Sequence, residues 1–483
     1  MKSKEVQISQ WANGAAVIRP LLQSPAEGRL VSYSLPAPGV SARQLLQHAE
    51  GQERFFWQNG RDKILFAGFG VAVQMMAWGG NRFTDIRRKA TTLFQQASLL
   101  SCPSDLATPR LFGGFAFDDD FTPDNTWSVF HPAHFILPHY QLVQSGQESW
   151  ITINAMLPED ENLGEAGEQL HEALVTRYES LIEENDGFQR RSLDPSSVII
   201  TYPMSQESWA EKIKEVISRI KDTALQKVVL SRVCELRSRE RIDVGRALSY
   251  LNNHATECTR FLFEPRPYHA FYGATPELLV QLSGTNVTTM ALAGSMPRGA
   301  TTTEDEVLVN QLLESPKNRH EHRLVVESMM RRLQPLSTQL QATQEPEIYT
   351  LSYIHHLLTP IKAQLRRPLG ILPLVKTLHP TPALGGSPRS MALDFIRHAE
   401  PVPRGWYAAP VGWIDCNMDG EFAVAIRSAV AQERRVWLYS GAGIVADSLP
   451  QKEWAETALK FQPMFSALGL PSERTQFSLE DLS

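Results

Sequence analysis

Three strand-like segments and a helix close the chain, and their spacing restricts the fold to one built on antiparallel sheets. Residues 406–414, 422–430 and 436–445 are rich in apolar and β-branched side chains, and an Asp-Gly pair between the first two is typical of a tight turn. Connections this short join antiparallel neighbours, because parallel strands need a crossover of a dozen residues or more. A helix opens near Pro450. The pattern predicts a β-meander packed against a C-terminal helix.

The rest of the chain contains elements of the same two kinds. Further strands are predicted at residues 64–73, 111–118, 150–154, 227–233, 259–263, 269–272 and 287–292. Helices are predicted at residues 86–100, 163–184, 205–223 and 304–333, the last interrupted at Pro316, and another is expected to start near Tyr353. The polar stretch Glu183–Ser197 is the best candidate for a linker. Runs of antiparallel strands that alternate with helix pairs predict an α+β fold.

Composition excludes several classes of protein. The 483 residues are 42% hydrophobic and 21% charged, with a formal net charge of −6, so no basic excess indicates a nucleic-acid or anionic-membrane partner. No apolar run approaches the length of a membrane span, and the N-terminus lacks the pattern of a secretory signal. The four cysteines (Cys102, Cys234, Cys258 and Cys416) include no C-x-x-C pair, so neither a disulfide framework nor a zinc site is indicated. We therefore expect a reduced, cytoplasmic enzyme.

The stretch Gly441–Lys460 combines a glycine turn with a helix that carries charges on one face. Glu453, Glu456 and Lys460 occur at i, i+3 and i+7, so their side chains project from the same side. A solvated helix face with a weak i,i+4 ion pair is the simplest explanation. However, the preceding Gly-x-Gly turn could let a small anion approach the backbone closely.

Four other stretches stand out, and each alone has a structural explanation. They are Gln226–Arg232, Tyr272–Leu279, Ser315–Arg323 and Ala425–Ser428. Lys227 begins a predicted strand, where most lysines are solvated, and Glu277 could be a carboxylate favoured by a helix dipole. Glu321 lies in a charged helix between His320 and His322, but an H-x-H pair without a third ligand is weak support for zinc. Spacing alone leaves these alternatives open.

Taken together, the five stretches resemble the motifs of the chorismate-utilising enzymes, in the same order and spacing. This family includes the isochorismate, salicylate, anthranilate and aminodeoxychorismate synthases, and the resemblance covers residues 205–468. A weaker likeness covers residues 1–195, where Phe112-Gly-Gly-Phe and Phe135-Ile-Leu-Pro look like the N-terminal part of the family. The resemblance implies an α+β fold of two stacked antiparallel sheets flanked by helices. Residues 1–195 would then be an N-terminal subdomain of that fold, and residues 205–468 the chorismate-binding catalytic region.

The resemblance also implies a magnesium site and a substrate pocket. Glu321 and Glu456 would be the Mg²⁺ ligands, with Glu453 nearby and acting through water; carboxylate oxygens are the ligands this ion prefers. The substrate-binding positions implied are Gly294 and Ser295 for the ring carboxylate, Tyr407, Arg427, Gly441 and Gly443 for the enolpyruvyl carboxylate, and His356, Ala383, Leu384 and Lys460 elsewhere in the pocket.

By the same resemblance, Lys227 is the general base and Glu277 the general acid. Lys227 would deprotonate a water that attacks C2 of chorismate, while Glu277 protonates the departing C4 hydroxyl on the opposite face. An acid is needed because hydroxide is a poor leaving group. The base must be partly neutral and the acid partly protonated near pH 7, and both states require shifted pKa values.

Two departures from the aminating members favour isochorismate as the product. Ala293 stands where aminodeoxychorismate synthases carry a nucleophilic lysine, and Ala383-Leu384 replaces a threonine-containing segment of the anthranilate synthases. No fused amidotransferase segment is present, and we expect no glutaminase partner and a monomer. The long N-terminal part favours quinone (menaquinone) biosynthesis. Alternatives are a siderophore-pathway isochorismate synthase, a salicylate synthase, and an inactive paralogue that acts as a binding protein.

Overall fold

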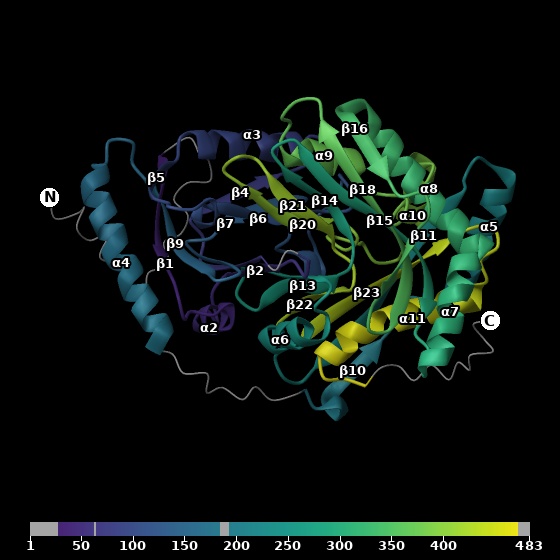
Figure 1. Ribbon diagram of the computed structural model, residues 1–483. Helices are drawn as coiled ribbons and strands as arrows, with labels where there is room; N and C mark the ends of the chain where they lie inside the picture. Colours follow the sequence, from purple (N-terminus) through teal and green to yellow (C-terminus); the bar gives the residue numbers. More distant parts are fainter. Residues whose placement is uncertain (1–27, 62–63, 184–192, 472–483) are drawn as a thin grey trace.

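The computed structural model describes residues 28–61, 64–183 and 193–471, which form two large sheets between layers of helices (Figure 1). The larger sheet has 13 strands, and all of its pairings are antiparallel except that of β1 with β5. Its strands in spatial order are β10 (Val198–Thr201), β11 (Lys227–Ser238), β23 (Arg435–Ile444), β22 (Ser428–Gln432), β13 (His269–Thr275), β12 (Thr259–Arg266), β2 (Arg54–Gln58), β3 (Leu65–Phe69), β8 (Tyr140–Ser145), β9 (Glu148–Leu157), β1 (Arg29–Pro36) and β5 (Ser98–Ser101), with β19 (Gly386–Ser387) paired to β11.

The second sheet has ten strands and is antiparallel. Its spatial order is β16 (Ser337–Ala342), β18 (Ile354–Leu365), β15 (Asn286–Pro297), β14 (Leu278–Ser283), β21 (Gly420–Val424), β20 (Pro410–Asp415), β6 (Arg110–Phe115), β7 (Ala133–Leu137) and β4 (Val73–Ala77), with β17 (Glu347–Thr350) paired to β18.

Helices cover the outer face of each sheet. Figure 1 shows α3 (Arg82–Gln95), α8 (Pro316–Leu333) and α9 (Ile371–Leu378) above the ten-stranded sheet. Below the 13-stranded sheet lie α2 (Ala42–His48), α6 (Val244–His254) and α11 (Pro450–Ala467). The remaining helices are α4 (Leu163–Glu183), α5 (Gln206–Asp222), α7 (Thr302–Glu314) and α10 (Arg389–Ala399). Within the described residues, none of these helices is both long and apolar enough to cross a membrane.

The core is divided by the 13-stranded sheet, and strand alternation explains the division. On β2, Phe55 and Trp57 belong to the cluster between the two sheets, together with Phe135 of β7. Phe56, between them, belongs to the cluster formed with the outer helices, which includes Phe461 of α11. Successive side chains of a strand point to opposite faces, so a strand buried on both sides reads as a continuous apolar run.

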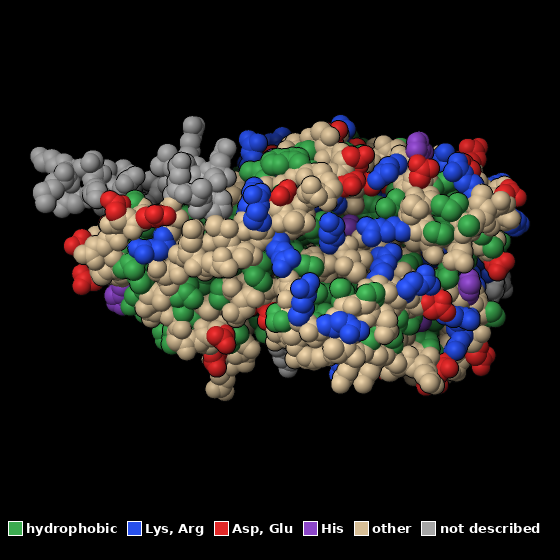
Figure 2. Space-filling view, turned by 90° about the horizontal axis from the view of Figure 1, so that it is seen from above, with side chains coloured by type: hydrophobic (Ala, Val, Ile, Leu, Met, Phe, Trp, Pro, Cys, Tyr) green, Lys and Arg blue, Asp and Glu red, His purple; other side chains and the backbone are tan. Residues whose placement is uncertain are grey.

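Basic side chains gather on one face of the molecule. Figure 2, seen from above Figure 1, shows Lys and Arg side chains concentrated in the middle of the face that α3, α8 and α9 cover. Exposed examples are Arg87 and Arg88 of α3 and Arg331 of α8. This concentration occurs on a chain whose formal net charge is −6.

Three sequence predictions are corrected by the structure. The predicted helix near Tyr353 is strand β18, which pairs with β15 on one side and with β16 and β17 on the other. The strand predicted at 64–73 is two strands of different sheets, separated at Gly70, whose φ of +68° turns the chain. The helix predicted at 86–100 ends at Gln95, and β5 follows. The interruption predicted at Pro316 is confirmed, since α7 ends before it and α8 begins there.

A fourth correction concerns the place where the site forms. The strand predicted at 422–430 is two strands: β21 lies in the ten-stranded sheet, and β22 lies in the 13-stranded sheet. Between them Arg427 has a φ of +50°, unusual for a residue with a side chain. The chain thus crosses between the sheets at Arg427, and this guanidinium is buried where they meet.

The candidate linker lies mostly outside the described residues, which omit 184–192. Strands from both sides of it join the same sheets: β2 pairs with β12, and β6 pairs with β20. The division into residues 1–195 and 205–468 stays a prediction.

Candidate active site

Lys227 and Glu321 meet above a glycine of the neighbouring strand. The Lys227 side chain at the start of β11 is fully buried, and its Nζ lies 2.7 Å from Oε1 of Glu321 on α8. A Cβ placed on Gly443 of β23 would lie 2.5 Å from that Glu321 oxygen and 2.8 Å from Cε of Lys227. Gly443 therefore has to be glycine for this ion pair to form.

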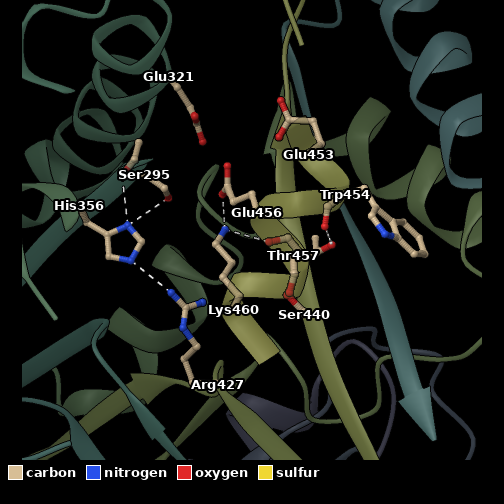
Figure 3. Close-up of polar contacts among 12 residues, drawn as sticks. Ser295, Glu321, His356, Arg427, Ser440, Glu453, Trp454, Glu456, Thr457 and Lys460 are labelled. Carbon is tan, nitrogen blue, oxygen red and sulfur yellow. Dashed lines mark hydrogen bonds and ion pairs between the residues drawn. The ribbon is translucent and has the colours of Figure 1, made fainter. Parts of the chain in front are cut away.

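The C-terminal helix contributes two more carboxylates, each held by a lysine. Nζ of Lys460 lies 2.5 Å from Oε1 of Glu456 and donates to the carbonyl oxygen of Gly441 at 2.9 Å. Nζ of Lys317 on α8 lies 2.8 Å from Oε1 of Glu453, which is 1% exposed. Figure 3 shows Glu321, Glu453 and Glu456 directed toward one region between α8 and α11. The predicted cluster of charges on one helix face is confirmed.

The pKa values of the two glutamates of α11, Glu453 and Glu456, are shifted in opposite directions. Burial acts to raise the pKa of Glu456, but the Lys460 cation and its hydrogen bond outweigh this effect and bring the pKa to about 2. Burial raises the pKa of Glu453, although Lys317 opposes the shift, and the Glu456 charge adds to it. Glu456 is therefore an ionised carboxylate at every ordinary pH.

Glu277 is a buried acid between β13 and β14. It is 4% exposed, and burial raises the pKa of its carboxyl to about 8, while the Lys227 cation opposes the shift. A carboxylic acid with this pKa is mostly protonated at pH 7. The sequence could not show such a shift, because it depends on the sheets that surround the side chain.

Arg427 and His356 form a second polar group. Nη2 of Arg427 lies 3.2 Å from Nε2 of His356, whose Nδ1 lies 3.1 Å from the Gly294 carbonyl oxygen and 3.1 Å from Ser295 Oγ (Figure 3). Burial lowers the pKa of His356 to about 3, helped by the Arg427 charge. The imidazole is neutral, and because arginine can only donate, Nε2 is the acceptor and Nδ1 carries the proton.

Gly294 lies at a bulge in β15, where the register with β18 shifts between Ala293 and Ser295. Its φ is +78°, and an added Cβ would lie 3.2 Å from Cβ of Asn318. A bulge next to a site re-aims the residue that follows it. Here it lets Ser295 reach the ring of His356.

Tyr407 and Leu384 contact segments that carry other predicted site residues. Tyr407 is 4% exposed, and its hydroxyl would be 3.1 Å from a Cβ on Gly441. The carbonyl of Leu384 accepts a hydrogen bond from Nη1 of the buried Arg404, whose Nη2 donates to the carbonyl of Val229 on β11. This contact ties the Ala383–Leu384 segment to the strand that carries Lys227.

Lys317 was missed by the sequence reasoning. A usable signal was present, because Lys317 lies four residues before Glu321 in one helix, and residues at i and i+4 share a face. It also has a charge partner on another helix, Glu453, and the field of Glu456 and Glu321 contributes to raising its pKa against burial.

The acidic residues suit a hard divalent cation. Within the described residues, no group of three or more His, Cys, Asp and Glu side chains is arranged as a metal-binding cluster. Instead, each of the three glutamates is neutralised by a lysine ammonium. Carboxylate oxygens with part of the coordination shell left to water and substrate are the donor set that Mg²⁺ prefers. The chemistry of these residues therefore fits the predicted ion.

Comparison with known proteins decides the family. Residues 16–469 match the family described as "Chorismate binding enzyme". The chain belongs to this family. The salicylate biosynthesis isochorismate synthase of Pseudomonas aeruginosa is 34% identical over 415 residues, covering 86% of this chain and 84% of that protein. Isochorismate synthase MenF of Bacillus subtilis is 31% identical over 452 residues, covering 91% and 93%.

A solved structure confirms the fold of this chorismate-binding enzyme. The menaquinone-specific isochorismate synthase MenF of Escherichia coli superposes with a TM-score of 0.75 over 96% of this chain and 100% of that one. At 23% identity this likeness shows the fold alone. The predicted α+β fold of two stacked antiparallel sheets flanked by helices is thus confirmed.

Proposed function

We propose that this chorismate-binding enzyme is an isochorismate synthase, an isomerase that converts chorismate reversibly into isochorismate with Mg²⁺. The observation that carries the proposal is the pairing of two buried groups around one site. Lys227 is a fully buried lysine, and Glu277 is a buried acid that is protonated at neutral pH and lies within the field of that lysine. Full-length relatives that are named isochorismate synthases support the same reaction.

Lys227 and Glu277 have different roles in the proposed reaction. Lys227 accepts a proton from the water that attacks C2 of chorismate, and Glu277 donates its proton to the C4 hydroxyl as this group leaves. Glu277 is suited to donate because burial keeps it protonated. Lys227 is held in place by Glu321, whose Oε1 lies 2.7 Å from its Nζ.

The remaining residues hold the substrate. Arg427 offers a planar fork to the enolpyruvyl carboxylate, and the neutral His356 fixes its orientation without competing for the anion. Tyr407 and the strand at Gly441 border the same place. Mg²⁺, held by Glu321 and Glu456 with Glu453 behind them, would neutralise the ring carboxylate next to Gly294 and Ser295. Without it, the acidic side chains would repel a dianion.

We further propose that the enzyme acts alone, as a cytoplasmic monomer without a glutaminase subunit, in quinone biosynthesis. The match to isochorismate synthase MenF of Bacillus subtilis over 93% of its length supports the part of this proposal that concerns quinone biosynthesis. The alternatives are a salicylate synthase or a siderophore-pathway isochorismate synthase; the Pseudomonas aeruginosa relative, named for salicylate biosynthesis, is matched over almost as much of its length.

The product provides the direct test of the function. Incubated with chorismate and Mg²⁺, the enzyme should form isochorismate that approaches an equilibrium with chorismate, without release of pyruvate. Ala293 supplies no amine to compete with water, and added ammonium should not change the product. Chromatography of the reaction with and without ammonium measures this. Stoichiometric pyruvate with salicylate, or any aromatic amine, would contradict the proposal.

The pH dependence should report Glu277. Its carboxyl is protonated below a pKa of about 8, so kcat/KM should fall as the pH rises through 8.

The stability of the protein should also fall as the pH rises. The folded state keeps the Glu277 proton up to a pKa of about 8, whereas the unfolded chain releases it near pH 4.5, so the free energy of unfolding should decline as the pH rises from about 4.5 to about 8. Comparing wild type with Glu277→Gln by urea unfolding over this range isolates the effect. Equal slopes in the two proteins would exclude the raised pKa.

A further inference from the structure

Arg232 lies beneath the helix that carries the acidic residues of the site. It is on β11, five residues after Lys227, and is 2% exposed. Its Nε donates a hydrogen bond to Oγ1 of Thr457 on α11 at 2.8 Å. Its guanidinium carbon lies 3.7 Å from the ring centroid of Trp454 and 4.9 Å from that of Phe461, also on α11.

This cation has no counter-ion in the part of the chain that the structure describes. Neither Nη1 nor Nη2 of Arg232 has a hydrogen-bond partner there, and no carboxylate forms an ion pair with it. Burial lowers the pKa of Arg232 to about 9, so the group is still charged at neutral pH. A buried unpaired charge is unfavourable, and an apolar side chain would fill the same space without that cost. Unlike an apolar side chain, arginine fixes an orientation, through one hydrogen bond and contacts with three rings: those of Trp454 and Phe461 and, at 5.5 Å, that of Tyr202.

Thr457 links Arg232 to the backbone of α11. Its Oγ1 accepts from Arg232 and donates to the carbonyl oxygen of Trp454 at 2.7 Å. Its own carbonyl oxygen accepts from Oγ of Ser440 on β23 at 2.8 Å. Two strands of the sheet are therefore joined to the same turn of α11. Figure 3 shows Trp454 and Glu456 on opposite sides of that turn.

We propose that Arg232 is a positioning residue: acting through Thr457, it fixes the rotation of α11 and so places Glu456 and Lys460 in the site. Glu456 is the residue before Thr457, and Lys460 follows on the same face one turn later. A rotation of the helix would move both groups away from Glu321, which is held on a different helix. Misplacement by about 1 Å can cost about 10²-fold in catalysis. The inference rests on the proposed function in one respect, the assignment of Glu456 to Mg²⁺.

Two substitutions of Thr457 test the inference without removing the buried arginine. Thr457→Val keeps the shape but removes the hydroxyl, and Thr457→Ser keeps the hydroxyl. We expect Thr457→Val to weaken Mg²⁺ binding about 10-fold, as loss of a group that orients a ligand commonly does, and Thr457→Ser to restore it. Arg232→Met should act like Thr457→Val, with Arg232→Lys intermediate. Arg237→Met, an exposed arginine on the same strand, is the matched control and should have no effect.

The measurement is calorimetric titration of each protein with MgCl₂ in the absence of chorismate, followed by kcat and the KM for Mg²⁺ and for chorismate. The effect should appear in Mg²⁺ affinity and not in the KM for chorismate. If wild type binds Mg²⁺ and Thr457→Val binds it equally well, the positioning role is wrong even if the melting temperature falls. If wild type itself binds no Mg²⁺, the metal assignment fails first and this inference fails with it. Should Arg232→Met not fold, the Thr457 pair decides.

Discussion

Lys227→Ala is expected to lower kcat for chorismate conversion by about 10²- to 10⁴-fold, the usual contribution of a positioned acid or base. The KM for chorismate should change little, because the amine acts mainly in the transition state. The side chain is fully buried and its one ion-pair partner is Glu321 among the described residues. Steady-state kinetics with saturating Mg²⁺ measures both constants.

Two further measurements separate a lost base from a damaged site. Small primary amines added to Lys227→Ala should restore part of the rate, since the cavity left by the side chain lies where the base acted. Lys362→Ala, which removes an exposed lysine of β18, is the control and should match wild type. A Lys227→Ala enzyme with nearly full kcat would rule out Lys227 as the base. A loss that comes entirely from KM would assign it to substrate binding instead.

The family was indicated by the resemblance of five motifs to the chorismate-utilising enzymes, whereas parts of the fold could be predicted because they depend on local chemistry along the chain. The face of Glu453, Glu456 and Lys460 follows from helix periodicity, and the structure has the three side chains where periodicity puts them. The break at Pro316 likewise follows from the geometry of proline. Such features need no knowledge of the rest of the molecule.

The errors arose where tertiary pairing decides the outcome. A helix is predicted to start near Tyr353, but Ile354–Leu365, which contains His355 and His356, is a strand with partner strands on both sides. At Arg427 the chain passes from one sheet to the other within a short segment, residues 422–430, whose side chains on both sides of Arg427 and Ser428 are apolar. No local pattern marks that crossing. The crossing between the sheets nevertheless buries the Arg427 guanidinium beside His356.

Contacts between segments that are distant in the chain could not be predicted from the sequence either. Glu277 looks like an ordinary first-turn carboxylate, and its raised pKa depends on burial by both sheets. Arg232 reads as one more arginine in a strand, and only the structure puts it against Trp454 and Thr457. Residue roles are therefore harder to predict than residue positions, because a role depends on neighbours that the chain brings together only on folding.

Glu321→Gln and Glu456→Gln should each remove Mg²⁺ binding and activity while the protein stays folded. Glutamine has nearly the same shape but no charge, and two carboxylates are the donors that Mg²⁺ would need here. Even the loss of an outer group costs about 10- to 100-fold in metal affinity, so loss of a direct ligand should exceed that. Calorimetric titration with MgCl₂, together with thermal unfolding, measures affinity and folding separately.

The two variants should also differ from each other. Glu321 is the ion-pair partner of Lys227, so Glu321→Gln removes a group next to the base as well as a ligand. Glu456 is held by Lys460 and has no contact of that kind with Lys227 in the described structure. Very high Mg²⁺ should therefore recover more activity in Glu456→Gln than in Glu321→Gln. Glu327→Gln, at an exposed position of α8, is the control and should bind Mg²⁺ normally. If both variants bind Mg²⁺ as tightly as this control, the ion is held elsewhere, and the three glutamates serve only to neutralise their lysines.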